Sequence, residues 1–143
     1  MEKVKKSTKK FIGSWQLMEW TAELDNGEIV FPFGEDAKGR ITYDKDGYMS
    51  VQIMKNRRHL FQSEDPLQAQ PEEITEAYNG FIAYCGLYEV NPDLNQVLHH
   101  IEISSFPNWV GQHQLRHYEF TEDKLILKSD FIGKSRHKLI WKK

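Results

Sequence analysis

The stretch from Gly80 to Phe120 most constrains the fold, because it alternates long extended runs with clear turn signals. The first run is rich in aromatic and aliphatic residues and ends at Asn91-Pro92-Asp93, where proline has no amide hydrogen to donate to a sheet. Two similar runs follow, from Val97 to Ser105 and from Gln112 to Phe120. We therefore expect three consecutive strands joined as an antiparallel meander.

The rest of the chain carries the same strand pattern on both sides of this meander. The other predicted strands are Phe11–Leu24, Glu28–Phe31, the two arms of a hairpin within Lys38–Met54, Lys124–Lys128 and His137–Trp141. This makes about eight or nine strands, and the last can pair with the first to close a barrel around one small ligand. The sequence thus predicts an all-β fold.

One interruption breaks the strand pattern between Lys55 and Gly80. Lys55–Gln70 is polar and irregular, as expected for a surface loop at a rim or lid. Pro71 then opens a short segment with apolar residues at helical spacing, which ends at Asn79-Gly80. We expect one short helix here that closes the open end of the barrel or covers its wall.

Length and composition limit the classes of protein to consider. A chain of 143 residues suits a single domain, predicted over residues 11–143, and residues 1–10 with five lysines are predicted to be a flexible basic tail. A formal net charge of −2 gives no reason to expect nucleic acid as a partner. One cysteine, Cys85, excludes an internal disulfide. With neither a secretion signal nor a membrane span visible, a cytoplasmic protein is expected.

Several motifs spread along the chain resemble one known family. They are Gly13-Ser14-Trp15, Gly39–Tyr48, Ala83–Tyr88, His99-His100-Ile101-Glu102, Phe106–Gly111 and Leu125-Ile126-Leu127. Together they are similar to the small lipocalin-like domain family, and the match covers about Phe11 to Trp141. The resemblance implies an up-and-down barrel with an internal cavity, in which Trp15 plugs the closed end. It implies no fixed reaction, because such barrels include carriers and enzymes.

The polar residues of the meander suggest where a ligand would bind. With His100 and Glu102 on the inward face of their strand, and Arg116 and Tyr118 inward on the next, one polar end forms inside an aromatic cavity. The opposite strand faces would instead turn His99 and His117 inward. Arg116-His117-Tyr118 also resembles the pair with which intracellular fatty-acid-binding barrels hold a carboxylate. The predicted ligand-binding residues are Tyr84, Tyr88, His100, Glu102, Arg116 and Tyr118. Alternatively, Arg116 and Glu102 form an internal ion pair and the tyrosines only pack.

Three functions remain open from the sequence. The first is a protein that binds a small apolar or aromatic molecule with a polar or anionic group. The second is an isomerase, cyclase or lyase with His100 as acid or base, oriented by Glu102, and Arg116 or Tyr118 stabilising charge. The third is an interaction module with a filled barrel, and a homodimer is compatible with all three.

Neither a metal nor a cofactor is predicted. The histidines His99, His100, His113 and His117 fall on two neighbouring strands, but alternation divides them between opposite faces. No metal-binding motif supports them.

Overall fold

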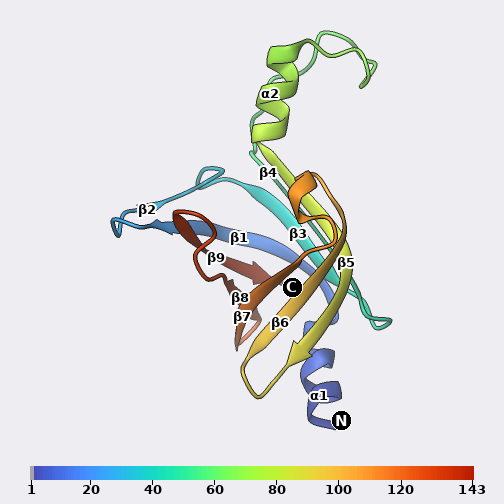
Figure 1. Ribbon diagram of the computed structural model, residues 1–143, viewed down its shortest axis with the longest axis vertical. Helices are drawn as coiled ribbons and strands as arrows, with labels where there is room; N and C mark the ends of the chain where they lie inside the picture. The colour runs from blue at the N-terminus through green and yellow to red at the C-terminus, as the bar shows by residue number, and fades with distance from the viewer. Residues whose placement is uncertain (1) are drawn as a thin grey trace.

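The computed structural model describes residues 2–143 and shows a closed antiparallel β-barrel (Figure 1). Its strands are β1 (Gly13–Leu24), β2 (Ile29–Val30), β3 (Lys38–Tyr43), β4 (Tyr48–Met54), β5 (Phe81–Asn91), β6 (Gln96–Ser104), β7 (His113–Thr121), β8 (Lys124–Lys128) and β9 (Ser135–Lys142). The helices are α1 (Glu2–Phe11), α2 (Pro71–Asn79) and the short 3₁₀ helix η1 (Pro107–Trp109).

Eight of the strands form the barrel in the order β1-β3-β4-β5-β6-β7-β8-β9, and β9 returns to pair with β1. That closing pair runs from Gln16 opposite Lys142 to Leu24 opposite Ser135. Strand β2 adds to β1 alone, outside the closed ring. The predicted all-β barrel, including the pairing of the last strand with the first, is confirmed.

Strand alternation decides which side chains enter the barrel. On β4, Met49, Val51 and Ile53 are buried while the residues between them are more exposed. The turn before β4 is held by the Asp44 carboxylate, which accepts hydrogen bonds from the amides of Asp46 and Tyr48, each at 2.9 Å. This pattern is usual for a strand that has one face toward the core and the other toward solvent.

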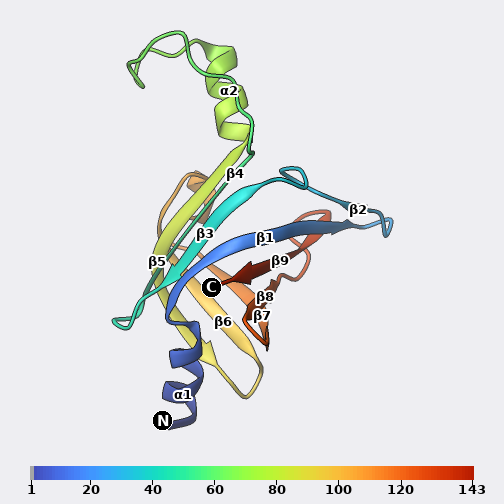
Figure 2. The ribbon, with the colours of Figure 1, turned by 180° about the vertical axis from the view of Figure 1, so that it is seen from behind.

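Helix α1 lies at one end of the barrel, where a flexible tail is predicted for residues 1–10 (Figures 1 and 2). Its last residue, Phe11, is fully buried and makes edge-to-face contacts with the rings of Tyr43, Tyr118 and Phe120. The buried indole of Trp15 donates a hydrogen bond to the carbonyl of Phe11 over 2.8 Å. The lysine-rich sequence is thus helical because its C-terminal end is anchored in the aromatic core.

Helix α2 lies at the opposite end and projects away from the barrel (Figures 1 and 2). It has no buried residue, and Ile74 and Tyr78 are about half exposed. The prediction that this helix covers the barrel is therefore wrong. Local contacts hold it instead: the Glu73 carboxylate accepts hydrogen bonds from the amides of Gln62 and Gln70. No helix within residues 2–143 combines the length and the apolar character that crossing a bilayer requires.

Candidate functional site

The pairing of β6 with β5 is regular from Gln96 to Ile101 and irregular after it. Cys85 pairs with Ile103 and Gly86 pairs with Ile101, so the intervening Glu102 forms a bulge without a partner on β5. A Cβ atom on Gly86 would lie 1.8 Å from the carbonyl oxygen of His100, so only glycine permits this close approach. The bulge reverses the alternation of β6: Ile101 is buried and Ile103 is 68% exposed.

Before the bulge, His99 lies inside the barrel on the same face of β6 as the buried Val97 and Ile101, and His100 lies outside. His99 is only 1% exposed, whereas His100 contacts the exposed Glu89 on the outer surface with 3.2 Å between Nε2 and Oε2. Glu102 is also exposed. The prediction that His100 and Glu102 point inward is therefore wrong, because the inward face of β6 up to the bulge is the other one, which carries Val97, His99 and Ile101.

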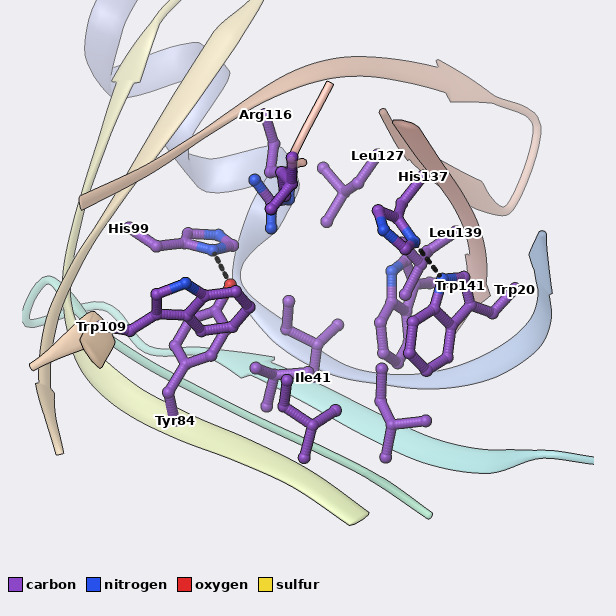
Figure 3. Close-up of a pocket in the computed structure, with 14 residues that line it drawn as sticks. Trp20, Ile41, Tyr84, His99, Trp109, Arg116, Leu127, His137, Leu139 and Trp141 are labelled. Carbon is purple, nitrogen blue, oxygen red and sulfur yellow. Dashed lines mark hydrogen bonds between the residues drawn. The ribbon is translucent and has the colours of Figure 1, made fainter. Parts of the chain in front are cut away.

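Arg116 does point inward, as the sequence predicts. Strand β7 pairs Gln114 with His99 and Arg116 with Val97, which puts the guanidinium into the interior beside His99 (Figure 3). Its Nη1 donates to the carbonyl of Leu115 at 2.9 Å and to the side chain of Gln114 at 3.3 Å. Arg116 forms no ion pair with any carboxylate of residues 2–143, so the alternative of an internal pair with Glu102 does not hold in this part of the chain.

The three predicted tyrosines divide between the two ends of the barrel. Tyr84 lines the same cavity as Arg116. Tyr88 instead donates its hydroxyl to the carbonyl of Asp44 over 2.7 Å and packs on Tyr43. Tyr118 packs on Phe11 at the α1 end. Only Tyr84 and Arg116 of the six predicted residues line the cavity.

The cavity has a volume of about 170 Å³ and occupies the half of the barrel away from Phe11. Most of its wall is apolar. Its fourteen lining residues are Trp20, Ile41, Val51, Ile53, Ile82, Tyr84, His99, Trp109, Arg116, Leu127, Ile132, His137, Leu139 and Trp141, and none has a carboxylate (Figure 3). Such a wall suits a small apolar or aromatic ligand.

Sequence reasoning misses several of these residues. Trp109 reaches the cavity through η1 and lies edge-on to Tyr84, with 5.7 Å between ring centres. Trp20 donates its indole N–H to Nδ1 of His137 at 3.0 Å. These two lining residues come from β1 and β9, the strands whose pairing closes the barrel. The sequence signal for His99 is its alternation with the apolar residues Val97 and Ile101, which share its face of the strand.

His99 is held between two phenols. Its Nε2 lies 2.7 Å from the hydroxyl of Tyr43 and its Nδ1 lies 2.7 Å from that of Tyr84. Burial, with a smaller contribution from the positive charge of Arg116, lowers the pKa of His99 to about 3, so the ring is neutral at ordinary pH. Burial also raises the pKa values of Tyr43 and Tyr84, so both hydroxyls keep their protons.

A neutral imidazole has one N–H and one lone pair, so one tyrosine donates to His99 and the other accepts from it. Tyr43 is fully enclosed and has no other hydrogen-bond partner in the described chain, whereas Tyr84 faces the cavity. An arrangement in which Tyr43 donates avoids an unused buried hydrogen. The hydroxyl hydrogen of Tyr84 is then free to donate into the cavity.

The remaining polar lining groups are also donors or are already paired. His137 accepts from Trp20 at one nitrogen and lies 3.2 Å from the Ser135 hydroxyl at the other. Trp141 Nε1 is the sole buried side-chain nitrogen or oxygen in residues 2–143 without a hydrogen-bond partner. No group of three potential metal ligands occurs among the side chains that the structure describes. The cavity therefore offers donors and a positive charge to whatever binds.

Comparison with known proteins gives one relative and several similar structures. The chain is 33% identical over 86 residues to the 4′-hydroxy-3′-methoxypropiophenone carrier protein of Aspergillus oryzae. The aligned region covers 55% of this chain and 77% of the relative. A lipocalin-like protein from Bacteroides uniformis aligns with a TM-score of 0.48 and 13% identity, covering 94% of this chain and 98% of that one. A redesigned β-barrel gives a TM-score of 0.48 and 10% identity, with 95% and 93% covered.

Neither structural likeness adds to what the strand pairing of this chain already shows. The family model is more informative, because the lipocalin-like domain matches residues 12–143, which is nearly the whole chain. This chain belongs to the lipocalin-like domain family.

Proposed function

We propose that this protein binds and carries a small, single-ring aromatic molecule whose oxygen atoms accept hydrogen bonds. The observation that supports this most is the cavity itself, which is apolar over most of its wall and has Arg116 and Tyr84 as polar groups. A dry cavity of about 150 Å³ is known to accept benzene. The volume of about 170 Å³ found here thus suits one substituted ring.

The name of the Aspergillus oryzae relative supports the same class of ligand. That protein is called a carrier of an aryl ketone with one ring. A ketone oxygen is a hydrogen-bond acceptor, which complements the donors in this cavity. We therefore propose aryl ketones as the first ligands to test.

The other two functions have less support. The enzyme alternative relies on His100 and Glu102, which lie on the outer surface. His99 takes their place inside, but its low pKa makes it a weak base. A filled barrel is also disfavoured, since the cavity has room for a ring.

The test is isothermal titration calorimetry with 4′-hydroxy-3′-methoxypropiophenone, followed by mass spectrometry of the recovered compound. We expect saturable binding, with the compound recovered unchanged. Ile82→Trp fills the cavity from β5 and should weaken binding by about tenfold or more. Ile103→Trp, on the outer face of β6, is the matched control and should have no effect.

Two outcomes would contradict the proposal. Conversion of the compound during incubation would favour the enzyme alternative. Absence of binding to any aryl ketone would leave the carrier proposal without support.

A further inference from the structure

The charge of Arg116 is incompletely balanced within the protein. Its side chain is only 9% exposed, and only Nη1 donates hydrogen bonds within residues 2–143, both to neutral oxygens. A buried guanidinium normally has a carboxylate or another anion beside it, because desolvating an unpaired charge is unfavourable. The nitrogens Nε and Nη2 are therefore available to a group inside the cavity.

Among the side chains that the structure describes, no neighbour of Arg116 supplies the missing negative charge. The titratable groups whose charge interacts with Arg116 are Tyr43 on β3, Tyr84 on β5, His99 on β6 and His137 on β9. Burial raises the pKa values of the two tyrosines and lowers those of the two histidines, so all four are neutral near pH 7. The cavity keeps a net positive charge from Arg116 alone.

Tyr84 supplies a second donor to the cavity. His99 lies 2.7 Å from both hydroxyls, and in the arrangement in which the enclosed Tyr43 donates to it, the Tyr84 oxygen accepts from the ring and the Tyr84 hydrogen is free for a ligand. Hydrogen bonds to a charged oxygen are roughly twice as strong as those between neutral groups. A guanidinium and an oriented phenol on the same cavity wall thus favour an oxyanion over a neutral oxygen.

We propose that the ligand is bound as an aryl oxyanion, with its charged oxygen on Arg116 and Tyr84 and its ring against the apolar wall. This inference rests on the proposed function and narrows the ligand class. The anion is an ionised acidic phenol, such as a 4-hydroxyphenyl ketone, or an arylcarboxylate. A 4-acyl group makes a phenol more acidic, because the carbonyl shares the negative charge of the ring oxygen.

Absorption spectroscopy tests the charge state of the bound molecule directly. The phenolate of 4′-hydroxy-3′-methoxypropiophenone absorbs at a longer wavelength than the neutral phenol. In a pH titration with excess protein, we expect the phenolate band of the bound compound to appear at least about one pH unit lower than in buffer, which is a tenfold preference for the anion. The 4′-O-methyl ether, which cannot ionise, should bind about tenfold more weakly or worse.

Variants test which side chains shift the ionisation of the bound phenol. Arg116→Gln should abolish the shift in ionisation, and Tyr84→Phe should reduce it. Arg57→Gln, at an exposed arginine outside the cavity, is the matched control and should keep the full shift. Circular dichroism of each variant shows whether the barrel remains folded. A second pair, 4-methoxybenzoate and its methyl ester, tests the carboxylate, and only the acid should bind tightly.

The outcomes separate the two proposals. If the ketone binds with the spectrum of the neutral phenol, or if the ether and ester bind as tightly as the anions, the oxyanion inference is wrong and the carrier function stands. An unchanged shift in Arg116→Gln would also overturn it. If none of the four compounds binds, the proposed function itself fails.

Discussion

At the scale of single residues, His99 shows how neighbours determine the charge of a buried group. It lies between the hydroxyls of Tyr43 and Tyr84, and Arg116 is near enough to oppose its protonation. The hydrogen bonds satisfy the neutral ring, whereas a proton on His99 would bring a second positive charge into an apolar cavity. The ring therefore orients Tyr84 without carrying charge itself.

This neutrality predicts a dependence of stability on pH. The pKa of His99 is about 3 in the folded protein, compared with 6.5 for an ordinary histidine. Below pH 6.5 the unfolded chain takes up a proton at this position and the folded chain does not. The free energy of unfolding should therefore fall as the pH decreases from 6.5 towards 3, by about 1.4 kcal/mol per pH unit from this residue.

Urea denaturation at a series of pH values measures the effect. His99→Gln should show a shallower dependence than the unmodified protein over this interval, and His100→Gln, on the outer face of the same strand, should not. Parallel curves for the unmodified protein and His99→Gln would contradict the prediction.

At the scale of elements, the segment between β4 and β5 stands apart from the barrel. No residue from Lys55 to Asn79 is buried, and Leu60 and Leu67 are 94% and 87% exposed. The ends of the segment are nevertheless adjacent, because the amide of Lys55 donates to the carbonyl of Gly80 over 2.8 Å. The barrel therefore does not depend on α2 for its core or its strand register.

Replacing residues 56–79 with Asn-Gly should leave the barrel folded. This pair favours the tight turn that joins antiparallel strands. We expect the free energy of unfolding to change by no more than about 1 kcal/mol, since the excised segment contributes little buried apolar surface. Chemical denaturation measures this change, and Arg58→Ala in the full chain accounts for the lost contact with the ring of Phe81. A loss above about 2 kcal/mol would show that the segment supports the barrel.

At the scale of the whole molecule, the two ends of the barrel differ in packing. Phe11 and the rings around it fill the α1 end, whereas the cavity occupies the other half. Stability and binding therefore depend on different ends of the same barrel.

Phe11→Ala should separate the two properties. Removing a fully buried phenylalanine typically costs about 3–5 kcal/mol. Affinity for the aryl ketone should change by less than about twofold while the protein stays folded, because Phe11 does not line the cavity. Denaturation and calorimetry give the two values, with Val4→Ala on the exposed side of α1 as the control. A large loss of affinity in folded Phe11→Ala would show that the two ends are coupled.

The strands, the meander and the closure of β9 on β1 can be predicted from the sequence, because alternation of apolar residues and turn signals are local properties. The sequence also places Arg116 and Tyr84 correctly on the inner face. Alternation shows which face of a strand a residue occupies, but not how far along the barrel axis it lies. The predicted site therefore includes Tyr88 and Tyr118, although both lie at the α1 end.

Which of the two adjacent histidines enters the cavity depends on pairing between strands that lie apart in the sequence. The pairing of His99 with the inward-facing Tyr88 on β5 turns His99 inward, and the bulge at Glu102, where Gly86 approaches the His100 carbonyl, changes only the faces of the residues beyond it. Likewise, whether α2 covers the barrel depends on competition between local capping and burial elsewhere, which helical spacing alone does not resolve. Local pattern sets the elements, and contacts between distant segments set the site.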